Sequence, residues 1–462
     1  MHQKNSAIAE GNMKIKNVED FSWLYALLKP FASFMHNHVF YKKVYTSGLE
    51  NIPEEGAVIF APNHQNALMD ALIILSVKNW QPVFMARADI FAGQFVRRLL
   101  FFMKILPIFR IRDGRENLKQ NDEIFEKSVQ VLRKKRYLVI YPEASHVGRR
   151  RLRPLKKGIT RIAFMAEEAS NYTLGVKIVP VGINYQDYFS FRTNAFINFG
   201  KPINVEDYRD LYLENPQKAN HELITDISNE LKSLIINIEN NEEYDNFETA
   251  RLVYAPYLVK KERKLVNNFK NRIYAGQQVV KLMDTLKNND LETFHKLNGC
   301  LSDYRKLLQQ ENLRDWIIRR RFTIPGVLLR TVILIAMSPV ALFGAVNNFL
   351  PYHTPDLFTR KIKDKNFHTS IRFAVYMFVF PLIFYPLIFF LLCQFTDSWL
   401  IRLIYMLLLP PTGIFAFHYF EEVKRVLAMW RYTFNRNKKS FECLRWLREQ
   451  ILDIFKSIEN NS

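Results

Sequence analysis

A histidine and an aspartate follow a short β-rich run near the start of the chain, in the segment Ala-Pro-Asn-His-Gln-Asn-Ala-Leu-Met-Asp. Histidine is the side chain whose ordinary pKa lies closest to neutral, so His64 could take a proton from a hydroxyl group. Such a base needs its ring held in one tautomer, and a carboxylate that binds the other ring nitrogen does this. Asp70 could supply the carboxylate.

The interval between these two residues limits which secondary-structure elements can contain them if they are to pair. Five residues separate His64 from Asp70, and six steps correspond to roughly 240° around a regular helix, so the two cannot meet on one helix face. We therefore expect His64 in the turn after a strand and Asp70 in the helix that follows. The alternative is a helix-capping Asn63 beside an ordinary surface histidine.

Two clusters of basic residues could bind phosphate groups near this pair. Arg110 and Arg112 stand at the end of the apolar run KILPIFRIR, where a pair of guanidinium groups could hold a phosphate by two-pronged hydrogen bonds. The run YLVIYPEASHVGRRRLRPLKKG places Glu143 and Ser145 after a second strand. Six basic residues follow within nine positions: Arg149, Arg150, Arg151, Arg153, Lys156 and Lys157. Solvated charges or a nucleic-acid patch are the alternatives for both clusters.

The elements that must position these residues alternate between short β-rich runs and helical stretches. From 43 to 205 the runs AVIFAP, PVFMAR, LPIFRI, YLVIYP and VKIVPVGINY, with the helical NALMDALIILSV, predict an α/β domain, a sheet with flanking helices. Residues 206–321 predict charged helices, as an insertion or lid. In 1–42, the aromatic stretch FSWLYALLKPFASFMHNHVF is too interrupted to span a bilayer; it predicts interfacial helices or, equally, an ordinary helix over the core.

The region 322–425 contains two or three candidate transmembrane segments. Arg330 and Asp356 bracket 25 uncharged residues, Arg372 and Asp397 bracket 24, and a third apolar run spans 403–420. Pro339 allows a kinked hairpin that re-enters the membrane, and three full spans are the alternative. Basic residues between 352 and 372, and in the tail 426–462, place both segments on the cytoplasmic side.

Charge and cysteine content narrow the class of protein. The formal net charge of +20 favours an anionic partner, and the crowding of 38 Phe and 21 Tyr into apolar stretches favours lipid over nucleic acid. Cys300, Cys393 and Cys443 lie far apart in the sequence, which excludes a disulfide framework or a close-spaced metal motif. We expect no metal, no cofactor and no nucleic-acid partner.

The blocks NHQNALMD, LPIFR, YPEASH and IVPVGINY, in this order between about 43 and 202, resemble the phospholipid/glycerol acyltransferase family, which is PlsC-type. The five-residue interval and the Pro-Glu-x-Ser-His form are similar to the subgroup of fungal-type glycerol-3-phosphate acyltransferases, which also carry membrane segments after the catalytic domain. Ala144 and His146 stand where the family usually has Gly and Arg. Arg149 or Arg151 could replace that arginine.

The resemblance implies an O-acyltransferase of glycerophospholipid synthesis. It would move an acyl group from acyl-coenzyme A or acyl-carrier protein to glycerol-3-phosphate or 1-acylglycerol-3-phosphate (lysophosphatidic acid). His64 would be the base, oriented by Asp70, in an integral membrane protein whose catalytic domain faces the cytoplasm. Arg110 would hold the acceptor phosphate, and Glu143 would contact the acceptor glycerol. The remaining predicted substrate-binding residues are Asn63, Arg112, Ser145, Arg149, Arg151 and Lys156. Another lyso-lipid acceptor, such as an amino-acid lipid, or a non-catalytic membrane lipid-binding scaffold are the alternatives.

Overall fold

The computed structural model describes residues 17–109, 120–145, 148–262, 268–360, 362 and 364–461. The chain forms two compact units. The first unit comprises Met1–Asn237 together with the short segment Asp364–Ser370, and the second comprises Ile238–Lys363 and Ile371–Ser462. The segment 364–370 thus belongs to the first unit although both of its chain neighbours belong to the second.

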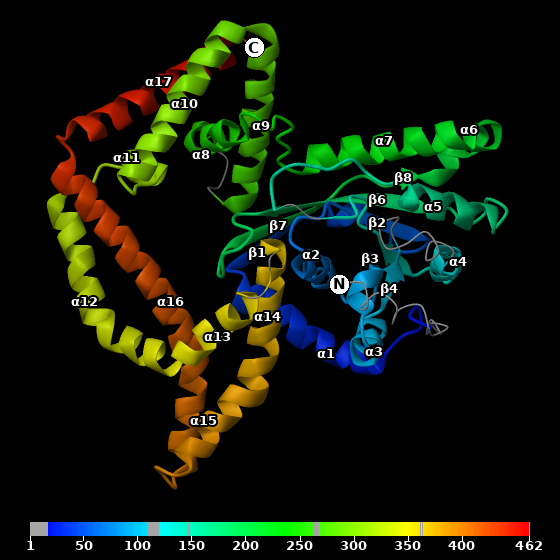
Figure 1. The fold of residues 1–462 in the computed structure, drawn as a ribbon, viewed down its shortest axis with the longest axis horizontal. Coiled ribbons are helices and arrows are strands. Elements are labelled where there is room, and N and C mark those ends of the chain that lie inside the picture. The colour runs from blue at the N-terminus through cyan, green and yellow to red at the C-terminus, as the bar shows by residue number, and fades with distance from the viewer. Residues whose placement is uncertain are drawn as a thin grey trace. The chain divides into compact units, whose positions relative to one another are not determined.

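An eight-stranded mixed sheet forms the centre of the first unit, in the order β1-β7-β6-β2-β5-β3-β4 with β8 paired to β6 (Figure 1). The strands are β1 (Lys43–Ser47), β2 (Val58–Pro62), β3 (Val83–Arg87), β4 (Ile105–Ile108), β5 (Tyr137–Val139), β6 (Lys177–Tyr185), β7 (Asn194–Phe199) and β8 (Ile203–Asn204). All neighbours are parallel except that β6 runs antiparallel to β7 and β8. All five residues of β2 are buried, as expected of a parallel strand covered on both faces. The predicted α/β class is confirmed.

Seven α-helices accompany the sheet in the described part of the first unit. They are α1 (Trp23–Phe34), α2 (Leu68–Leu75), α3 (Gln94–Phe102), α4 (Gln120–Arg133), α5 (Gly158–Glu168), α6 (Arg209–Glu214) and α7 (Pro216–Leu234). Short helical turns lie at Met35–Phe40, Leu49–Asn51, Ala88–Phe91 and Val205–Tyr208. The core combines strand residues such as Ile59 and Leu138 with helix residues such as Ile162.

The boundary of the α/β part lies later than the predicted residue 205. Helix α7 packs along β6 (Figure 1), and its buried Leu223, Ile227 and Leu231 belong to the same core as the strands. Because α7 supplies part of the apolar cover of the sheet, the first unit continues to Asn237. The prediction that charged helices separate from the α/β domain at 206 was therefore wrong by about one helix pair.

Helix α1, in the N-terminal aromatic stretch, packs one side on the core and exposes apolar residues on the other. Its buried Lys29 donates hydrogen bonds to the carbonyl oxygens of Lys78 and Trp80 just after α2, so one side of the helix is attached to the core. The other side exposes apolar residues, with Trp23 83% and Leu27 74% exposed. Exposed aromatic and leucine side chains of this kind suit the interfacial zone of a bilayer.

The second unit is helical throughout its described residues. It contains α8 (Tyr244–Lys261), α9 (Phe269–Asn289), α10 (Leu291–Gln310), α11 (Asp315–Ile318), α12 (Ile324–Asn347), α13 (Phe349–Thr359), the part of α14 (His368–Val379) after Ser370, α15 (Tyr385–Leu392), α16 (Trp399–Asn435) and α17 (Lys439–Asn461). A 3-10 turn at Lys365–Phe367 precedes α14, and a π-helical turn at Phe380–Phe384 joins it to α15.

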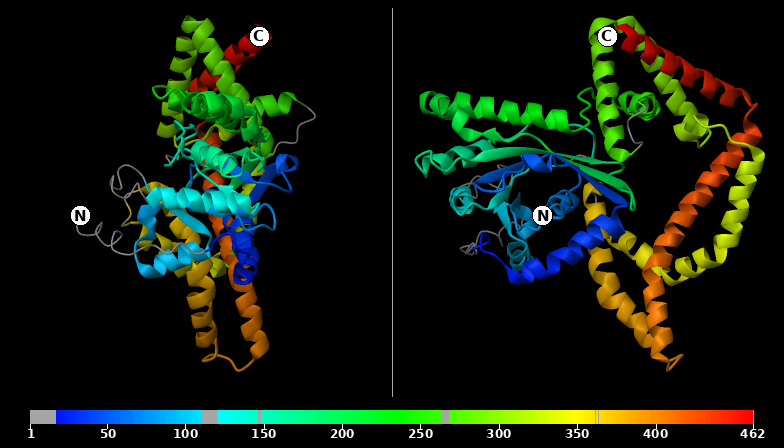
Figure 2. Two further views of the ribbon diagram at one scale, coloured as in Figure 1. Left: turned by 90° about the vertical axis from the view of Figure 1, so that its right-hand side faces the viewer. Right: turned by 180° about the vertical axis from the view of Figure 1, so that it is seen from behind.

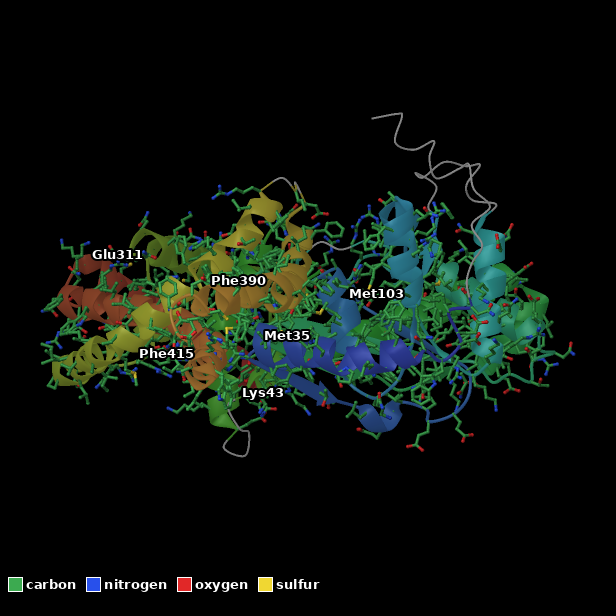
Figure 3. The ribbon with its side chains drawn as sticks, turned by 90° about the horizontal axis from the view of Figure 1, so that it is seen from below. Met35, Lys43, Met103, Glu311, Phe390 and Phe415 are labelled. Atoms are coloured by element: carbon green, nitrogen blue, oxygen red, sulfur yellow. The ribbon has the colours of Figure 1, made fainter. Side chains whose placement is uncertain are left out.

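Three helical stretches are long and apolar enough to cross a membrane: Ile324–Asn347, His368–Leu392 and Trp399–Asn435. Their apolar side chains mostly face outward; Leu382 and Phe390 are 67% and 64% exposed, and Phe390 is labelled in Figure 3. Such surfaces need lipid around them, so the chain is a membrane protein. Helices α15 and α16 run side by side as a hairpin (Figure 2), with a tight turn between Leu392 and Trp399.

Pro339 does not interrupt the first of these stretches. Helix α12 continues through it to Asn347, and the break comes at Asn348 before α13. A proline leaves the carbonyl four residues earlier without its backbone donor, and here the Ser338 hydroxyl donates to that carbonyl, Ile335 O, at 2.7 Å. The hairpin predicted at Pro339 is therefore not formed there.

Helices α12 and α16 pack closely within the second unit. A Cβ atom at Gly344 would lie 2.1 Å from the Thr412 carbonyl oxygen, so only glycine permits this backbone approach. The side chain of Asn348 donates to Leu409 O at 3.1 Å, and the Trp430 indole donates to Thr331 Oγ1 at 2.9 Å. Small residues and interhelical hydrogen bonds are the usual means of helix association in lipid.

Candidate active site

The turns that contain His64 and Glu143 meet at the carboxyl edge of the sheet. Strands β2 and β5 are parallel neighbours, with Phe60 opposite Val139. The carboxyl ends of adjacent parallel strands meet at one edge, where side chains from both following turns can converge. The turn after β2 contains His64, and the turn after β5 contains Glu143. The sheet register therefore joins blocks about eighty positions apart in the sequence.

His64 and Asp70 are paired in the way that their interval requires. His64 lies in the turn after β2, Asp70 lies in the first turn of α2, and His64 Nδ1 is 2.8 Å from Asp70 Oδ2. The His64 side chain is 17% exposed, whereas that of Asp70 is 0% exposed. The ring thus reaches the surface while its carboxylate partner stays shielded from water, and the geometric prediction is confirmed.

The Asp70 carboxylate accepts hydrogen bonds from four groups. Oδ2 accepts the His64 ring, the N–H of Gln65 at 2.8 Å and the N–H of Asn66 at 2.7 Å. Oδ1 accepts the Tyr185 hydroxyl at 2.8 Å. Because the carboxylate acts as acceptor throughout, His64 Nδ1 carries the hydrogen, and Nε2 is the nitrogen that would take a proton from a substrate.

Tyr185 is a member of this site that the sequence prediction missed. It ends β6 and is fully buried. Burial, followed by the charge of Asp70, raises the pKa of Tyr185 well above its ordinary value, which keeps its hydroxyl as a donor. Its position at the end of the block VKIVPVGINY, at the same sheet edge as His64, was the available signal.

We expect Tyr185→Phe to lower kcat by about tenfold or somewhat more, because a hydrogen bond to a charged group contributes about 1.5–3 kcal/mol. Steady-state kinetics of the purified protein would measure the loss. Tyr208→Phe is the matched control, since the Tyr208 hydroxyl also donates to an aspartate, Asp226, but on an exposed surface. Equal kinetics for Tyr185→Phe and Tyr208→Phe would contradict the assigned role of Tyr185.

The carboxyl group of Glu143 binds two backbone N–H groups. Oε1 accepts the backbone N–H of His64 at 2.6 Å, and Oε2 accepts the backbone N–H of Arg153 at 2.8 Å. Only 2% of the residue is exposed. Because both oxygens are engaged by main-chain amides, the carboxyl joins the His64 turn to the basic run. The structure thus gives Glu143 a bridging role between two segments, and its contact with the acceptor glycerol stays a prediction.

The pH dependence of stability should report on Glu143. Burial raises its pKa to about 8, although the two amide hydrogen bonds lower it. A folded-state pKa above the unfolded value stabilises the fold at low pH, and this stabilisation disappears as the pH rises towards the folded pKa. We expect the free energy of unfolding to fall by up to about 1.4 kcal/mol per pH unit between pH 5 and pH 8.

Thermal unfolding in detergent at a series of pH values would measure this dependence. Glu143→Gln cannot ionise, so its unfolding temperature should change less over the same range even though it starts lower. Glu54→Gln, at an exposed position, controls for the general effect of removing a carboxylate. Parallel pH profiles for wild type and Glu143→Gln would show that Glu143 does not titrate in this window.

Asn63 and Ser145 also face protein groups. Asn63 is 1% exposed; its Nδ2 donates to Ile183 O at 3.1 Å, and its Oδ1 accepts from Ile183 N–H at 2.6 Å. Its side chain therefore joins the end of β2 to β6, and its role in substrate binding stays a prediction. Ser145 is half-buried, and its hydroxyl accepts a hydrogen bond from the Arg153 guanidinium.

The basic run lies beside the His64 turn. Arg149 and Lys156 are exposed and Arg151 is half-buried, while the Gln65 side chain donates to Arg151 O at 2.9 Å. Exposed cations attached to the turn in this way could receive phosphate groups. The predicted Arg110 and Arg112 lie outside the described residues, as does His146.

Tyr141 was not predicted for this site, and Arg150, predicted only as one of the basic run, lies inside the protein rather than on its surface. The ring of Tyr141 lies 4.2 Å, centroid to centroid, from the imidazole of His64. Arg150 is only 6% exposed; it donates to Gln186 O at 3.2 Å and lies over the Tyr188 ring. Among the described residues, no group of three or more His, Cys, Asp or Glu side chains is placed to hold a metal ion.

Comparisons with known proteins found a family model and similar proteins for this part of the chain. Residues 43–184 match the family model described as Acyltransferase. Glycerol-3-phosphate O-acyltransferase 2 of Saccharomyces cerevisiae is 29% identical over 199 residues, which are 42% of this chain and 25% of the yeast protein. The 1-acyl-sn-glycerol-3-phosphate acyltransferase of Borreliella burgdorferi is 26% identical over 163 residues, 35% of this chain and 59% of that protein.

A solved structure was also found, that of the 1-acyl-sn-glycerophosphate (LPA) acyltransferase PlsC from Thermotoga maritima. It is 21% identical, covers 43% of this chain and 78% of the PlsC chain, and superposes with a TM-score of 0.30. The chain spans about a quarter of the length of the yeast relative that it matches.

Proposed function

We propose, from the premise that residues 43–184 form a domain of the acyltransferase family, that this protein transfers a fatty acyl group in glycerolipid synthesis. The donor is acyl-coenzyme A or acyl-carrier protein. The acceptor is the hydroxyl group of glycerol-3-phosphate or of 1-acylglycerol-3-phosphate. The observation that carries the proposal is the 2.8 Å contact between His64 Nδ1 and the buried Asp70 carboxylate, beside a run of exposed basic residues.

The proposed reaction needs one base and no covalent enzyme intermediate. His64 Nε2 takes the proton of the acceptor hydroxyl as the hydroxyl oxygen attacks the thioester carbonyl carbon. The new C–O bond forms, the C–S bond breaks, and the imidazolium returns its proton to the leaving sulfur, so that a free thiol is released. The Asp70 carboxylate stabilises the imidazolium between these two steps.

Charges near the base support phosphate-containing substrates. Arg149 and Lys156 are exposed on the loop that Glu143 and Gln65 fasten to the His64 turn. Positive side chains at such a place would attract the acceptor phosphate or the phosphates of the acyl carrier. The names of the yeast and Borreliella relatives, a glycerol-3-phosphate and a 1-acyl-sn-glycerol-3-phosphate acyltransferase, support the two acceptors given above.

The membrane helices support a lipid product. An acyl chain that enters or leaves the site must pass between protein and bilayer, and an anchored enzyme shortens that path. We place the catalytic domain on the cytoplasmic side, because basic residues flank the apolar segments. They include Arg360 and Lys365 between two of the segments, and Arg436 and Lys438 just before α17.

An acceptor screen with the purified full-length protein tests the proposal. The protein would be supplied with acyl-coenzyme A or acyl-carrier protein and, separately, glycerol-3-phosphate, 1-acylglycerol-3-phosphate and a lyso-amino-acid lipid. Free thiol and the acylated product would be measured, the latter by mass spectrometry. We expect transfer to a glycerol-phosphate acceptor. Transfer only to the amino-acid lipid would reassign the acceptor, and binding of lipid without any transfer would support the non-catalytic scaffold instead.

A further inference from the structure

Helix α2, which carries Asp70, has no capping side chain of its own. Its N-cap residue is Ala67, which has nothing to accept a hydrogen bond from the first turn. The first N–H groups of a helix need acceptors from elsewhere. Asp70 accepts the N–H groups of Gln65 and Asn66, and the N–H of Leu68 donates to Ser370 Oγ at 3.1 Å. The cap of the helix thus comes from 302 positions further along the chain.

A second hydrogen bond from the same distant segment supports the same turn. The carbonyl oxygen of Tyr188 accepts both the Asn66 side-chain amide and the Thr369 hydroxyl, each at 2.9 Å. Thr369 is 1% exposed and Ser370 is 8% exposed. Two neighbouring buried hydroxyls therefore hold the turn. Ser370 binds Leu68 directly, and Thr369 binds the Tyr188 carbonyl that also accepts from Asn66.

The turn needs external support because its backbone is strained. Ala67 has φ 44° and ψ −121°, a region in which a non-glycine residue costs about 1–3 kcal/mol. Such a conformation persists only where the surroundings hold it. Ala67 lies between Asn66 and Leu68, the two residues that the Thr369 and Ser370 contacts restrain.

Thr369 and Ser370 stand in the first turn of an apolar helix. They are the second and third residues of the stretch His368–Leu392, which is long and apolar enough to cross a membrane. They nevertheless belong to the segment Asp364–Ser370 that is part of the first unit. The start of this candidate span is therefore built into the same unit as the His64 turn.

We propose that Thr369 and Ser370 are positioning residues for the His64–Asp70 pair, so that the turn reaches its working geometry only when the first turn of this apolar helix is seated against it. The inference rests on the proposed acyl transfer for its effect on catalysis. Its structural part, that the two hydroxyls hold the turn, is independent of what the site catalyses.

Kinetics of hydroxyl-removing variants test the catalytic part. We expect Ser370→Ala and Thr369→Val each to lower kcat by about tenfold, with KM for donor and acceptor unchanged because neither residue reaches a substrate. Ser370→Thr keeps a hydroxyl and should recover most of the activity. Ser457→Ala and Thr354→Val are the matched controls, since those hydroxyls donate to the carbonyls of Ile454 and Leu350 in their own helices.

Amide hydrogen exchange, followed by mass spectrometry, tests the structural part without any activity. In Ser370→Ala, peptides covering 63–70 should exchange faster than in wild type and in Ser457→Ala, while peptides of β6 and α7 should not change. If the wild type transfers no acyl group but exchange at 63–70 rises, the proposed function fails and the positioning role holds. Unchanged kcat with unchanged exchange overturns the positioning role, and so does faster exchange throughout the sheet, which would indicate general unfolding.

Discussion

Replacing His64 by glutamine is expected to lower kcat for acyl transfer by about a thousandfold. Positioned general acid–base groups contribute about 10²- to 10⁴-fold, and in the proposed reaction the ring serves twice, as base towards the acceptor and as acid towards the leaving sulfur. Glutamine retains a polar side chain of similar reach but cannot accept and return a proton at neutral pH. Its KM values should change little, since in the proposed site the basic run, and not His64, binds the substrate phosphates.

The rate of thiol release at saturating donor and acceptor, with the acylated product quantified by mass spectrometry, measures this effect. His221→Gln provides the control, because His221 is an exposed histidine on α7 of the same unit. A His64→Gln protein that keeps its melting temperature and turns over like His221→Gln would remove His64 from the reaction.

Asp70→Asn is expected to lower kcat by about 10²- to 10³-fold, with a folded turn. In serine proteases the equivalent change costs about 10⁴-fold because the asparagine forces the wrong histidine tautomer. Here two backbone N–H groups point at Oδ2 as well as the ring, so the asparagine oxygen should take that place and its NH₂ should face Tyr185. The tautomer would be preserved, and the loss would come from the missing negative charge beside the imidazolium.

The same kinetic assay, with Asp226→Asn as the control for an exposed aspartate that also accepts from a tyrosine, measures the effect. Asp70→Ala should be worse than Asp70→Asn in both kcat and melting temperature, since alanine leaves four donors without an acceptor. Full activity in Asp70→Asn would show that the negative charge is not needed and that the side chain only accepts the N–H groups of its own turn.

The strands that the sequence predicted are those with a continuous apolar run. VIFAP in β2 and KIVPVGINY in β6 are buried almost throughout, and burial on both faces produces runs of this kind. The sequence did not reveal β1, β7 or β8. KVYTS and NAFINF mix polar with apolar residues in short runs, and β8 has only two residues, so local composition carries little signal there.

The site was predictable where the argument depended on local geometry. The interval between His64 and Asp70 excluded a pairing of the two on one face of a helix, and so predicted that the histidine lies in a turn. Sequence reasoning could not foresee the contacts that side chains make with the main chain. The side chain of Asn63 binds the backbone of Ile183. The carboxyl group of Glu143 binds the backbone N–H groups of His64 and Arg153. Which amides lack partners depends on the folded backbone and is not visible in the sequence.

Contacts between distant positions explain the remaining omissions. Tyr185 reaches Asp70 from 115 positions away, and Ser370 reaches Leu68 from 302 positions away. Each looks unremarkable in its own neighbourhood, one as the last residue of a strand and the other as a serine ahead of an apolar run. Their roles follow from sheet register and from the return of the chain to the first unit.

The return of residues 364–370 to the first unit also constrains how often the chain can pass through a bilayer. The chain leaves this unit after Asn237 and rejoins it at Asp364, so the number of crossings between these points must be even. Only α12 among the described helices there is long and apolar enough to cross, and one crossing is an odd number. An α12 that dips into one leaflet without crossing would satisfy this count, and the chain would then turn back at Asn348, whose side chain donates hydrogen bonds to Leu409 O and Gly344 O.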